Sequence, residues 1–347
     1  MSLTNVAVVG FGYWGPNLVR NLCELDNCRV KTVCDAQASR LNTVRRRYPS
    51  IEATQDWRDL LSDPEIDAIA IATPVSTHYP LAKAALLAGK HVLIEKPMAC
   101  SSEHCEELID LGKRQGKIVL VDHTFVYTGA VRKIKELIRS GEMGQIVYFD
   151  SVRVNLGLFQ HDVDVMWDLA PHDLSIMIHL LEKTPVAVRA VGLTLPELKH
   201  TSIAYLAFEF DDAVIGHVHV NWFAPVKIRQ TLLAGTRKMI VYDDNDPSEK
   251  VKLYDKGIKL ATREDIYQTL VQYRMGDMSS PKLDQTEALL TECRHFIECI
   301  QGRCEPESGG ELGLQVVRVL EAASESLRSL GQRVEVKGRM LSAGAAA

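Results

Sequence analysis

A buried-strand pattern, a glycine-rich turn and a helix pattern follow one another at the start of the chain. This order constrains the fold more than any other feature of the sequence. The apolar run Asn5–Gly10 leads into Gly10-Phe11-Gly12-Tyr13-Trp14-Gly15, and the helix pattern Pro16–Leu25 follows. Gly10 permits a tight turn, Gly12 lets the backbone approach a pyrophosphate, and Gly15 lets the helix pack closely on the strand. Because a helix N-terminus also offers unpaired N–H groups to phosphates, the pattern predicts a dinucleotide-binding turn.

The alternation of strand and helix continues to about residue 122. Further apolar runs indicate strands without a polar face, at Arg29–Asp35, Ile66–Thr73, Gly89–Glu95 and Ile118–Asp122. Helix patterns separate them. Apolar strands in strict alternation with helices predict a parallel sheet that is covered on both sides.

The pattern changes after residue 122. One helix is expected over residues 130–139, and longer strands then alternate apolar and polar residues, at Gln145–Asn155, Ala204–Asp211, Val214–Trp222, Arg229–Leu233, Met239–Tyr242 and Val251–Tyr254. This period of two predicts a mainly antiparallel sheet with one face against helices and one open face. Since an open face needs a cover, we expect a homodimer or homotetramer formed through it. Two helix patterns, Thr286–Ile300 and Glu311–Leu330, follow.

The predicted fold class is therefore α/β plus α+β, with a Rossmann domain followed by an open-faced, mainly antiparallel β-sheet domain. We predict an NAD-binding Rossmann domain at residues 1–122, a substrate-binding and oligomerisation domain at 123–337, and a flexible tail at 338–347. A length of 347 residues is enough for two domains with separate cores.

Composition excludes several classes of protein. The net charge of −5 is spread along the chain, so no basic stripe indicates a nucleic-acid partner. No apolar run is long enough to span a membrane, and the first residues lack the features of a signal peptide. The eight cysteines include no Cys-x-x-Cys pair and are interpreted as reduced thiols, which favours a cytoplasmic location.

Asp35 ends the second predicted strand, 20 residues after Gly15. A carboxylate there can accept both ribose hydroxyls and repels a 2′-phosphate, so we expect NAD rather than NADP. Arg40 is the one nearby cation that could weaken this preference. The predicted cofactor-binding residues are Gly10, Phe11, Gly12, Tyr13, Trp14, Gly15, Asp35, Thr73, Pro74, Thr77, His78, Glu95, Lys96 and His123.

Glu95-Lys96-Pro97 follows the fourth strand of the first domain, and Thr73-Pro74 ends the third in the same way. Ligands of open parallel sheets lie outside the carboxyl ends of the strands, so Lys96 is placed at the binding crevice. From position alone, a solvated surface lysine is the more common interpretation.

The glycine-rich turn, Ala72-Thr73-Pro74 with His78, and Glu95-Lys96-Pro97 together resemble the glucose–fructose oxidoreductase/inositol dehydrogenase (Gfo/Idh/MocA) family. The change of pattern after residue 122 is similar too, and the resemblance covers nearly the whole chain. It implies that Lys96 is catalytic and contacts both the reacting sugar and the nicotinamide.

The family's Asp-x-x-x-His signature falls on Asp168 and His172. Because Pro171 is tolerated in a first helical turn, we expect both residues to flank the start of the apolar helix Leu174–Leu181. The resemblance implies that His172 is the acid/base and Asp168 its partner or a substrate ligand. Two alternatives are that Asp168 caps the helix, or that a metal site forms from His161, Asp162, Asp164, Asp168 and His172. A nicotinamide enzyme needs no metal for this chemistry, so none is expected.

Further residues are candidates for the substrate pocket. Besides Lys96, Asp168 and His172 they are Phe125, Tyr127, Arg153, Asn155 and Trp167. His217 and His219 share one face of a strand and are expected to meet a partner chain. Residues 161–166 depart from the family's usual Gly-Gly pair, which puts the shape of the pocket in question.

Residues 12–21 resemble family members that oxidise C3 of a UDP-N-acetylglucosamine-type nucleotide sugar to a ketone for later amination, in surface-polysaccharide or lipid A pathways. We therefore predict an NAD-dependent oxidoreductase acting on such a sugar. A free cyclitol or monosaccharide dehydrogenase and a 3-ketosugar reductase are alternatives. Glycoside hydrolysis through transient oxidation is another, and a non-catalytic dinucleotide sensor is an alternative of a different class.

Overall fold

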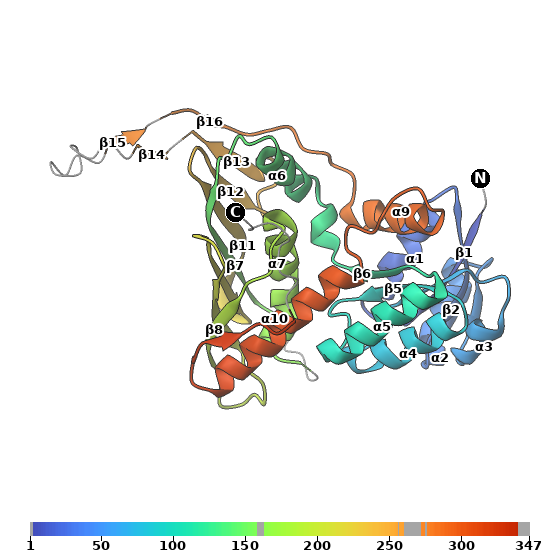
Figure 1. Ribbon diagram of the computed structural model, residues 1–347. Coiled ribbons are helices and arrows are strands. Elements are labelled where there is room, and N and C mark those ends of the chain that lie inside the picture. The colour runs from blue at the N-terminus through green and yellow to red at the C-terminus, as the bar shows by residue number, and fades with distance from the viewer. Residues whose placement is uncertain (1–2, 158–162, 256, 260–271, 275, 339–347) are drawn as a thin grey trace. The chain divides into compact units, whose positions relative to one another are not determined.

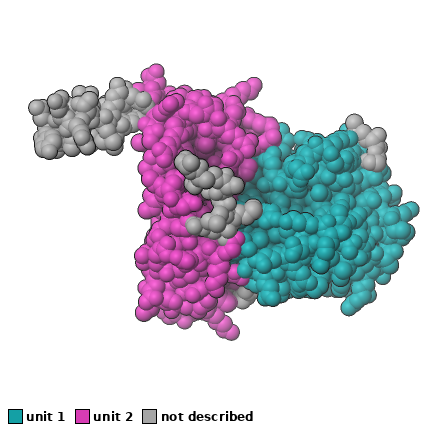
Figure 2. All heavy atoms as spheres, viewed as in Figure 1, with its two compact units in different colours: residues 1–128, 286–318 teal, residues 129–285, 319–347 magenta. Residues whose placement is uncertain are grey.

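The computed structural model describes residues 3–157, 163–255, 257–259, 272–274 and 276–338. The chain forms two compact units, shown in different colours in Figure 2. Unit 1 comprises residues 1–128 and 286–318, and unit 2 comprises residues 129–285 and 319–347. The sequence predicts a single boundary near residue 122, whereas both units are built from two separate stretches of chain.

Unit 1 contains a six-stranded parallel sheet in the order β3-β2-β1-β4-β5-β6. Its strands are β1 (Thr4–Val9), β2 (Cys28–Cys34), β3 (Glu52–Thr54), β4 (Ala68–Ile71), β5 (His91–Glu95) and β6 (Val119–Asp122). The order reverses between β1 and β4, which is where open sheets of this type bind ligands. The predicted Rossmann sheet is thus present, and only the short edge strand β3 was not expected.

Four helices of unit 1 follow the predicted alternation, whereas Arg58–Ser62 was not expected to be helical and Ala288–Ile300 was expected in the second domain. The helices are α1 (Gly15–Cys23), α2 (Ala38–Arg47), α3 (Arg58–Ser62), α4 (His78–Leu87), α5 (Ser102–Gln115) and α9 (Ala288–Ile300), with short 3₁₀ turns η1 (Val75–Thr77) and η2 (Thr124–Tyr127). Helices α1, α2 and α9 share one buried core with β1 and β2. The late helix α9 packs against α1, so a distant segment completes this unit (Figure 1).

Unit 2 is built on a nine-stranded sheet in the order β16-β13-β12-β11-β7-β10-β9-β8-β17. Its strands are β7 (Ile146–Leu156), β8 (Ala187–Leu193), β9 (Ile203–Glu209), β10 (Ile215–Asn221), β11 (Phe223–Gly235), β12 (Met239–Asp243), β13 (Val251–Tyr254), β16 (Met278–Ser279) and β17 (Val334–Glu335). Only β7 and β10 pair in parallel. Strands β14 (Gly257–Lys259) and β15 (Gln272–Arg274) form a separate pair.

Helix α7 (Val165–Leu181) packs on β7, β9 and β10, and α6 (Gly129–Arg139) packs against α7 (Figure 1). Helix α10 (Gly310–Arg328) is divided between the units at residue 318. Large apolar side chains remain exposed on the other face of the sheet, namely Val191, Leu193, Tyr205 and Ile215. This agrees with the expected sheet with one open face.

The start of α7 differs from the prediction. The helix begins at Val165 rather than near Pro171, because the Asp164 side chain accepts a hydrogen bond from the Trp167 amide (2.9 Å) and caps it there. Pro171 therefore lies inside the helix, where it removes one backbone hydrogen bond. Within the described residues, no helix combines the length and apolar character needed to cross a membrane.

Candidate active site

The glycine-rich turn between β1 and α1 has the geometry that its residues predict. Gly10 has a φ of +96°, and a Cβ atom on it would lie 2.4 Å from the Ala72 carbonyl oxygen. A Cβ atom on Gly15 would lie 1.9 Å from the Gly10 carbonyl oxygen. Neither position can hold a side chain, so the strand, the turn and the helix N-terminus are held close together as a phosphate-binding turn requires.

The aromatic residues of this turn have different environments. Phe11 is buried in the core of unit 1, whereas the Tyr13 side chain is 88% exposed. The Trp14 indole N–H donates a hydrogen bond of 2.5 Å to Asp122 Oδ2. Trp14 therefore ties the glycine-rich turn to the end of β6.

Asp35 is buried at the end of β2 and already holds the turn. Its carboxylate accepts hydrogen bonds from the backbone amides of Phe11 (2.7 Å) and Gln37 (2.8 Å). The Arg40 guanidinium lies 3.2 Å from Asp35 Oδ2. Arg40 was named from the sequence as the cation that could weaken discrimination against a 2′-phosphate, and the structure places it beside the carboxylate.

The carboxyl edge of the sheet brings Lys96 and His123 together. Glu95 of β5 pairs with Asp122 of β6, so the next residues on the two strands are Lys96 and His123. His123 is 1% exposed, and neither of its ring nitrogens has a hydrogen-bond partner among the described residues. Burial and the nearby Lys96 ammonium lower the pKa of His123 to about 3, so its ring is neutral. A buried neutral ring with unused polar atoms at this edge fits a bound nicotinamide group.

His78 fixes the turn that carries Lys96. Its Nδ1 lies 2.9 Å from the Pro97 carbonyl oxygen and its Nε2 lies 2.8 Å from the Thr73 carbonyl oxygen. The Lys96–Pro97 peptide bond is cis. The Thr77 hydroxyl is hydrogen-bonded to the Thr73 hydroxyl at 2.7 Å. His78 thus connects the ends of β4 and β5, the two strands whose following turns were predicted to line the cofactor site, and Thr77 holds the turn after β4.

A buried pair of acids lies behind this edge. Glu292 of α9 is fully buried, and Asp122 is 2% exposed. Burial and the neighbouring Asp122 carboxylate raise the pKa of Glu292 well above its usual range. Asp122 meanwhile accepts hydrogen bonds from Trp14 and the Thr124 hydroxyl. We conclude that Glu292 is protonated. Glu292 could not be predicted as part of the site, because its interaction with Asp122 joins segments that are distant in the sequence.

Asp168 and His172 lie four residues apart on α7 and therefore share one face of the helix. The Trp222 indole N–H donates a hydrogen bond of 3.0 Å to Asp168 Oδ2 and so orients this carboxylate. The alternative that Asp168 caps the helix is wrong, because Asp164 is the capping residue. His161 and Asp162 lie outside the described residues. The other three candidate ligands do not form a metal-binding group among the residues that the structure describes.

Arg153 is buried in an ion pair with Asp173. It is 5% exposed on β7, and its Nε and second terminal nitrogen donate to the Asp173 carboxylate at 2.6 and 3.3 Å. Asp173, on α7, also accepts a hydrogen bond of 2.7 Å from the Ser151 hydroxyl. This buried ion pair joins β7 of the unit 2 sheet to helix α7.

The remaining pocket candidates differ in their burial and in their hydrogen bonds. The Tyr127 hydroxyl is buried against Ser308 (2.9 Å), and the Trp167 indole N–H donates to the Ser324 hydroxyl (3.0 Å). Asn155 is half-buried near the end of β7, and Phe125 is half-buried in η2. Tyr127 and Trp167 therefore use their polar atoms within the protein.

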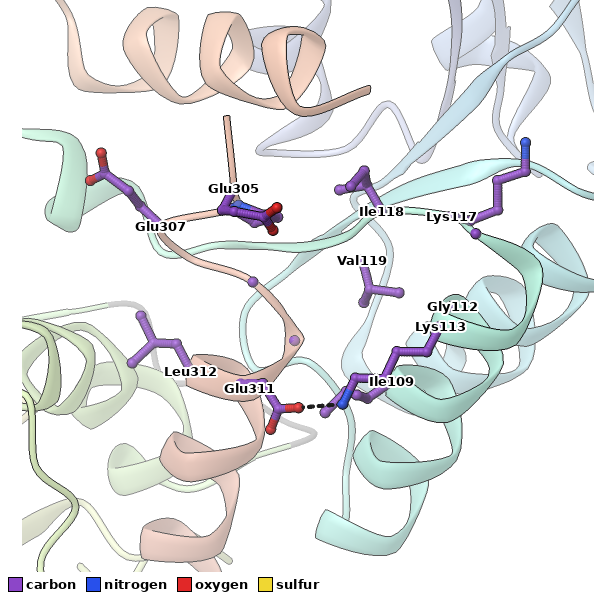
Figure 3. A pocket seen from close by; sticks show the side chains of 14 residues that line it. Ile109, Gly112, Lys113, Lys117, Ile118, Val119, Glu305, Glu307, Glu311 and Leu312 are labelled. Atoms are coloured by element: carbon purple, nitrogen blue, oxygen red, sulfur yellow. Dashed lines mark hydrogen bonds and ion pairs between the residues drawn. The ribbon is translucent and has the colours of Figure 1, made fainter. Parts of the chain in front are cut away.

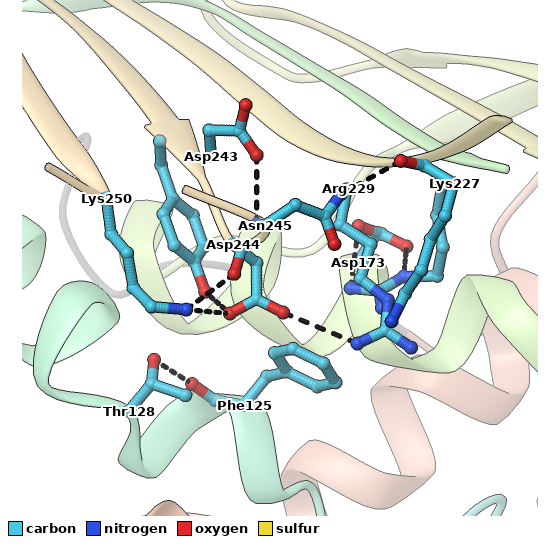
Figure 4. A network of polar contacts seen from close by, with 11 residues as sticks. Phe125, Thr128, Asp173, Lys227, Arg229, Asp243, Asp244, Asn245 and Lys250 are labelled. Carbon is cyan, nitrogen blue, oxygen red and sulfur yellow. Dashed lines mark hydrogen bonds and ion pairs between the residues drawn. The ribbon is translucent and has the colours of Figure 1, made fainter. Parts of the chain in front are cut away.

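Figure 4 shows a second polar network of unit 2 that the sequence did not indicate. Asp244 forms ion pairs with Lys250 at 3.1 Å and with Arg229 at 3.4 Å, and the Tyr242 hydroxyl donates a hydrogen bond to it at 3.3 Å. These cations lower the pKa of Asp244, although its burial opposes them. Arg229 is half-buried at the edge of this network and is a better-exposed cation than Arg153.

A cavity of about 450 Å³ in unit 1 lies away from these residues (Figure 3). It is lined by the end of α5, by Ile118 and Val119 at the start of β6, and by residues 305–312. Because Asp122 and His123 are at the opposite end of β6, this cavity is distinct from the predicted cofactor site.

Two family models match the chain. Residues 4–123 match the oxidoreductase family with an NAD-binding Rossmann fold, and residues 131–241 match the GFO/IDH/MocA C-terminal domain. The chain belongs to the Gfo/Idh/MocA family. It is accordingly an NAD-binding oxidoreductase, as the glycine-rich turn and Asp35 predicted.

Relatives of this Gfo/Idh/MocA protein act on different compounds. An uncharacterized oxidoreductase of Bacillus subtilis is 24% identical over 95% of this chain and 96% of its own. A UDP-N-acetylglucosamine 3-dehydrogenase of Acidithiobacillus ferrooxidans is 31% identical over 54% of this chain and 57% of its own. Its structure superposes with a TM-score of 0.80, over 95% of this chain and 99% of that chain, at 22% identity. A levoglucosan dehydrogenase in complex with NADH superposes at a TM-score of 0.83 and 20% identity, over 97% of this chain and 100% of that chain. These likenesses show the fold but not the substrate.

Proposed function

We propose that this protein is an NAD-dependent dehydrogenase that oxidises a secondary hydroxyl, C3 of a nucleotide sugar such as UDP-N-acetylglucosamine, to a keto group. The observation that carries the proposal is the position of Lys96 beside neutral His123 at the carboxyl edge of the parallel sheet. The substrate class is supported by the relative that acts on UDP-N-acetylglucosamine and by the resemblance of residues 12–21.

Each side chain has a role in this proposal. Lys96 donates a hydrogen bond to the reacting hydroxyl oxygen, and His172 removes the hydroxyl proton. Asp168, held by Trp222, favours the imidazolium that His172 becomes. The glycine-rich turn and Asp35 would hold the phosphates and ribose of NAD, which supplies the hydride acceptor when bound. In the reducing direction, His172 returns the proton.

A second candidate substrate is a free cyclitol or monosaccharide. The observation that favours it is the burial of Arg153 in its ion pair with Asp173. Arg153 was the residue expected to hold the diphosphate, so a nucleotide sugar would require other donors. The exposed Lys227 and the half-buried Arg229 on β11 are the described cations that could take this role.

The test is NADH formation with UDP-N-acetylglucosamine, other UDP-sugars, inositol and glucose. We expect turnover with a UDP-sugar and a loss of about 10²–10⁴-fold in kcat in Lys96→Ala. The control is Lys113→Ala, which changes an exposed lysine near the end of helix α5. This variant should retain activity. Turnover only with unphosphorylated compounds would favour the second candidate. Wild-type protein that binds NAD but oxidises nothing would favour a dinucleotide sensor, and release of sugar without NADH would indicate hydrolysis.

The open face of the unit 2 sheet is proposed to form a homodimer or homotetramer. Its exposed apolar side chains, including Val191, Leu193 and Ile215, support this proposal. His217 and His219 lie on the same face, where Tyr205 stacks on His219 with ring centroids 4.2 Å apart. Light scattering on wild type and Ile215→Asp tests the proposal. A wild type that is monomeric at micromolar concentration would contradict it.

A further inference from the structure

A group of two cysteines and one histidine lies at the end of α9 in unit 1. Their potential ligand atoms, from His295, Cys299 and Cys304, all lie within 4.8 Å of one another. The sequence analysis interpreted these cysteines as idle thiols. No part of the proposed dehydrogenase reaction uses them.

The local structure explains how the three side chains meet. His295 and Cys299 are four residues apart on α9 and so share one face of the helix. Gly302, with a φ of +70°, then reverses the chain, and the Arg303 amide bonds back to the Glu298 carbonyl oxygen (3.0 Å). This turn returns Cys304 to the same face.

We propose that His295, Cys299 and Cys304 form a binding site for one zinc ion. The two sulfur atoms are 3.5 Å apart. His295 Nδ1 lies 3.5 Å from Cys304 Sγ, and its Nε2 lies 3.5 Å from Cys299 Sγ. In a tetrahedral site, Zn–S bonds of about 2.3 Å and Zn–N bonds of about 2.0–2.1 Å separate the ligand atoms by roughly 3.5–3.8 Å. The separation of the two sulfur atoms and that between Nδ1 and Cys304 Sγ match this geometry, whereas Cys299 Sγ faces Nε2, so the His295 ring must rotate for Nδ1 to meet both sulfur atoms.

The charges around the site favour a cation. The carboxylates of Glu298 and Glu305 are close enough to Cys299 to interact with it electrostatically. Two thiolates and an imidazole select zinc over magnesium or calcium, which prefer oxygen ligands. A water molecule or one of these carboxylates can complete the tetrahedron.

Two residues that follow Cys304 line a cavity. Glu305 and Glu307, which follow Cys304, line the 450 Å³ cavity of unit 1 and both are labelled in Figure 3. His295 and Cys304 are themselves half-buried rather than enclosed. The ligand group is therefore only partly covered by the protein.

Zinc binding should change one backbone hydrogen bond. His295 Nε2 accepts a hydrogen bond of 3.0 Å from the Glu307 amide, so Nδ1 carries the ring proton in the metal-free protein. Zinc at Nδ1 replaces that proton, and Nε2 then becomes a donor. The Glu307 amide must turn away, which gives a signal that does not depend on enzymatic activity.

The experiment is a zinc titration of the reduced full-length protein in competition with a chromophoric chelator. We expect one zinc ion per chain, binding weaker by more than about 100-fold in Cys304→Ser, and unchanged binding in Cys23→Ser. Cys23 is an exposed cysteine outside the group and serves as the matched control. Cobalt bound in place of zinc should show thiolate-to-metal charge-transfer absorption in wild type and Cys23→Ser, and weaker absorption in Cys304→Ser.

Hydrogen exchange at Glu307 provides the second measurement, with faster exchange expected on addition of zinc. Absence of zinc binding by reduced wild type, or equal binding by Cys304→Ser, would overturn the proposal. Neither readout requires a sugar or NAD, so failure here is distinguishable from failure of the proposed dehydrogenase function. His295→Gln, which keeps both thiols, should also weaken binding, and a variant with wild-type affinity would exclude the imidazole as a ligand.

Discussion

The buried ion pair between Arg153 and Asp173 allows a structural role and a substrate-binding role to be separated. The side chains are 6% and 3% exposed, and the carboxylate receives two guanidinium nitrogens and the Ser151 hydroxyl. Arg153→Met keeps most of the side-chain volume but leaves a buried carboxylate without its cation. Removing one partner of a buried pair typically destabilises a protein by about 3–5 kcal/mol.

At about 2–4 °C per kcal/mol for a unit of this size, the melting transition of unit 2 should fall by roughly 6–20 °C. The double variant Arg153→Met/Asp173→Leu should recover most of this loss, because it removes both charges together. Scanning calorimetry measures both variants. If Arg153→Met melts within 1–2 °C of wild type and only the KM for substrate rises, the reasoning is refuted and Arg153 binds substrate.

Three other changes test separate parts of the site. Asp35→Ala should increase use of NADP relative to NAD, because Arg40, at 3.2 Å from the lost carboxylate, can then pair with a 2′-phosphate. Adding Arg40→Ala to this variant should abolish the gain. An unchanged ratio of kcat/KM for NADP to kcat/KM for NAD would contradict the prediction. His172→Ala should lower kcat by about 10²–10⁴-fold with little change in melting temperature, since the side chain is half-buried. Comparison with Asp168→Asn, which keeps an acceptor for the Trp222 indole, tests the pairing of Asp168 with His172. Glu292 has a raised pKa in the folded protein, so the folded state binds more protons than the unfolded state once pH exceeds the ordinary value near 4.5. The unfolding free energy of wild type should consequently fall as pH rises above that value, and Glu292→Gln should remove this decline. Identical pH profiles of the unfolding free energy in wild type and Glu292→Gln would show that Glu292 is ionised.

The cofactor half of the site was predictable because its signals are local. Gly10 and Gly15 lie within one turn, and their lack of a side chain is required by backbone atoms that are close in sequence or on the adjacent strand. Lys96 follows directly from the rule that ligands lie at the carboxyl ends of parallel strands. Glu292 carries no such signal, since a glutamate in an amphipathic helix normally faces solvent and only the fold brings it to Asp122.

The position of α7 shows where two local rules conflict. A proline disfavours the helix interior, which placed the predicted start at Pro171, whereas Asp164 supplies a capping carboxylate seven residues earlier. One cap and a long apolar helix outweigh the single hydrogen bond that Pro171 removes. Asp168 and His172 still share a face, because a spacing of four residues has that consequence anywhere inside a helix.

The role of Arg153 could have been derived from the period of its own strand. Phe149 is apolar and must face the helices, and residues two and four positions later on β7, Ser151 and Arg153, then face the same side. A guanidinium on the buried face of a sheet requires a carboxylate nearby. Helix α7, which packs on β7, contains two acids, Asp168 and Asp173, so side-chain parity and the cost of an unpaired buried charge narrow the partner of Arg153 to these two. The same reasoning favours Arg229, which stays half-buried at the edge of its ion-pair network, as the cation that remains within reach of a negatively charged substrate.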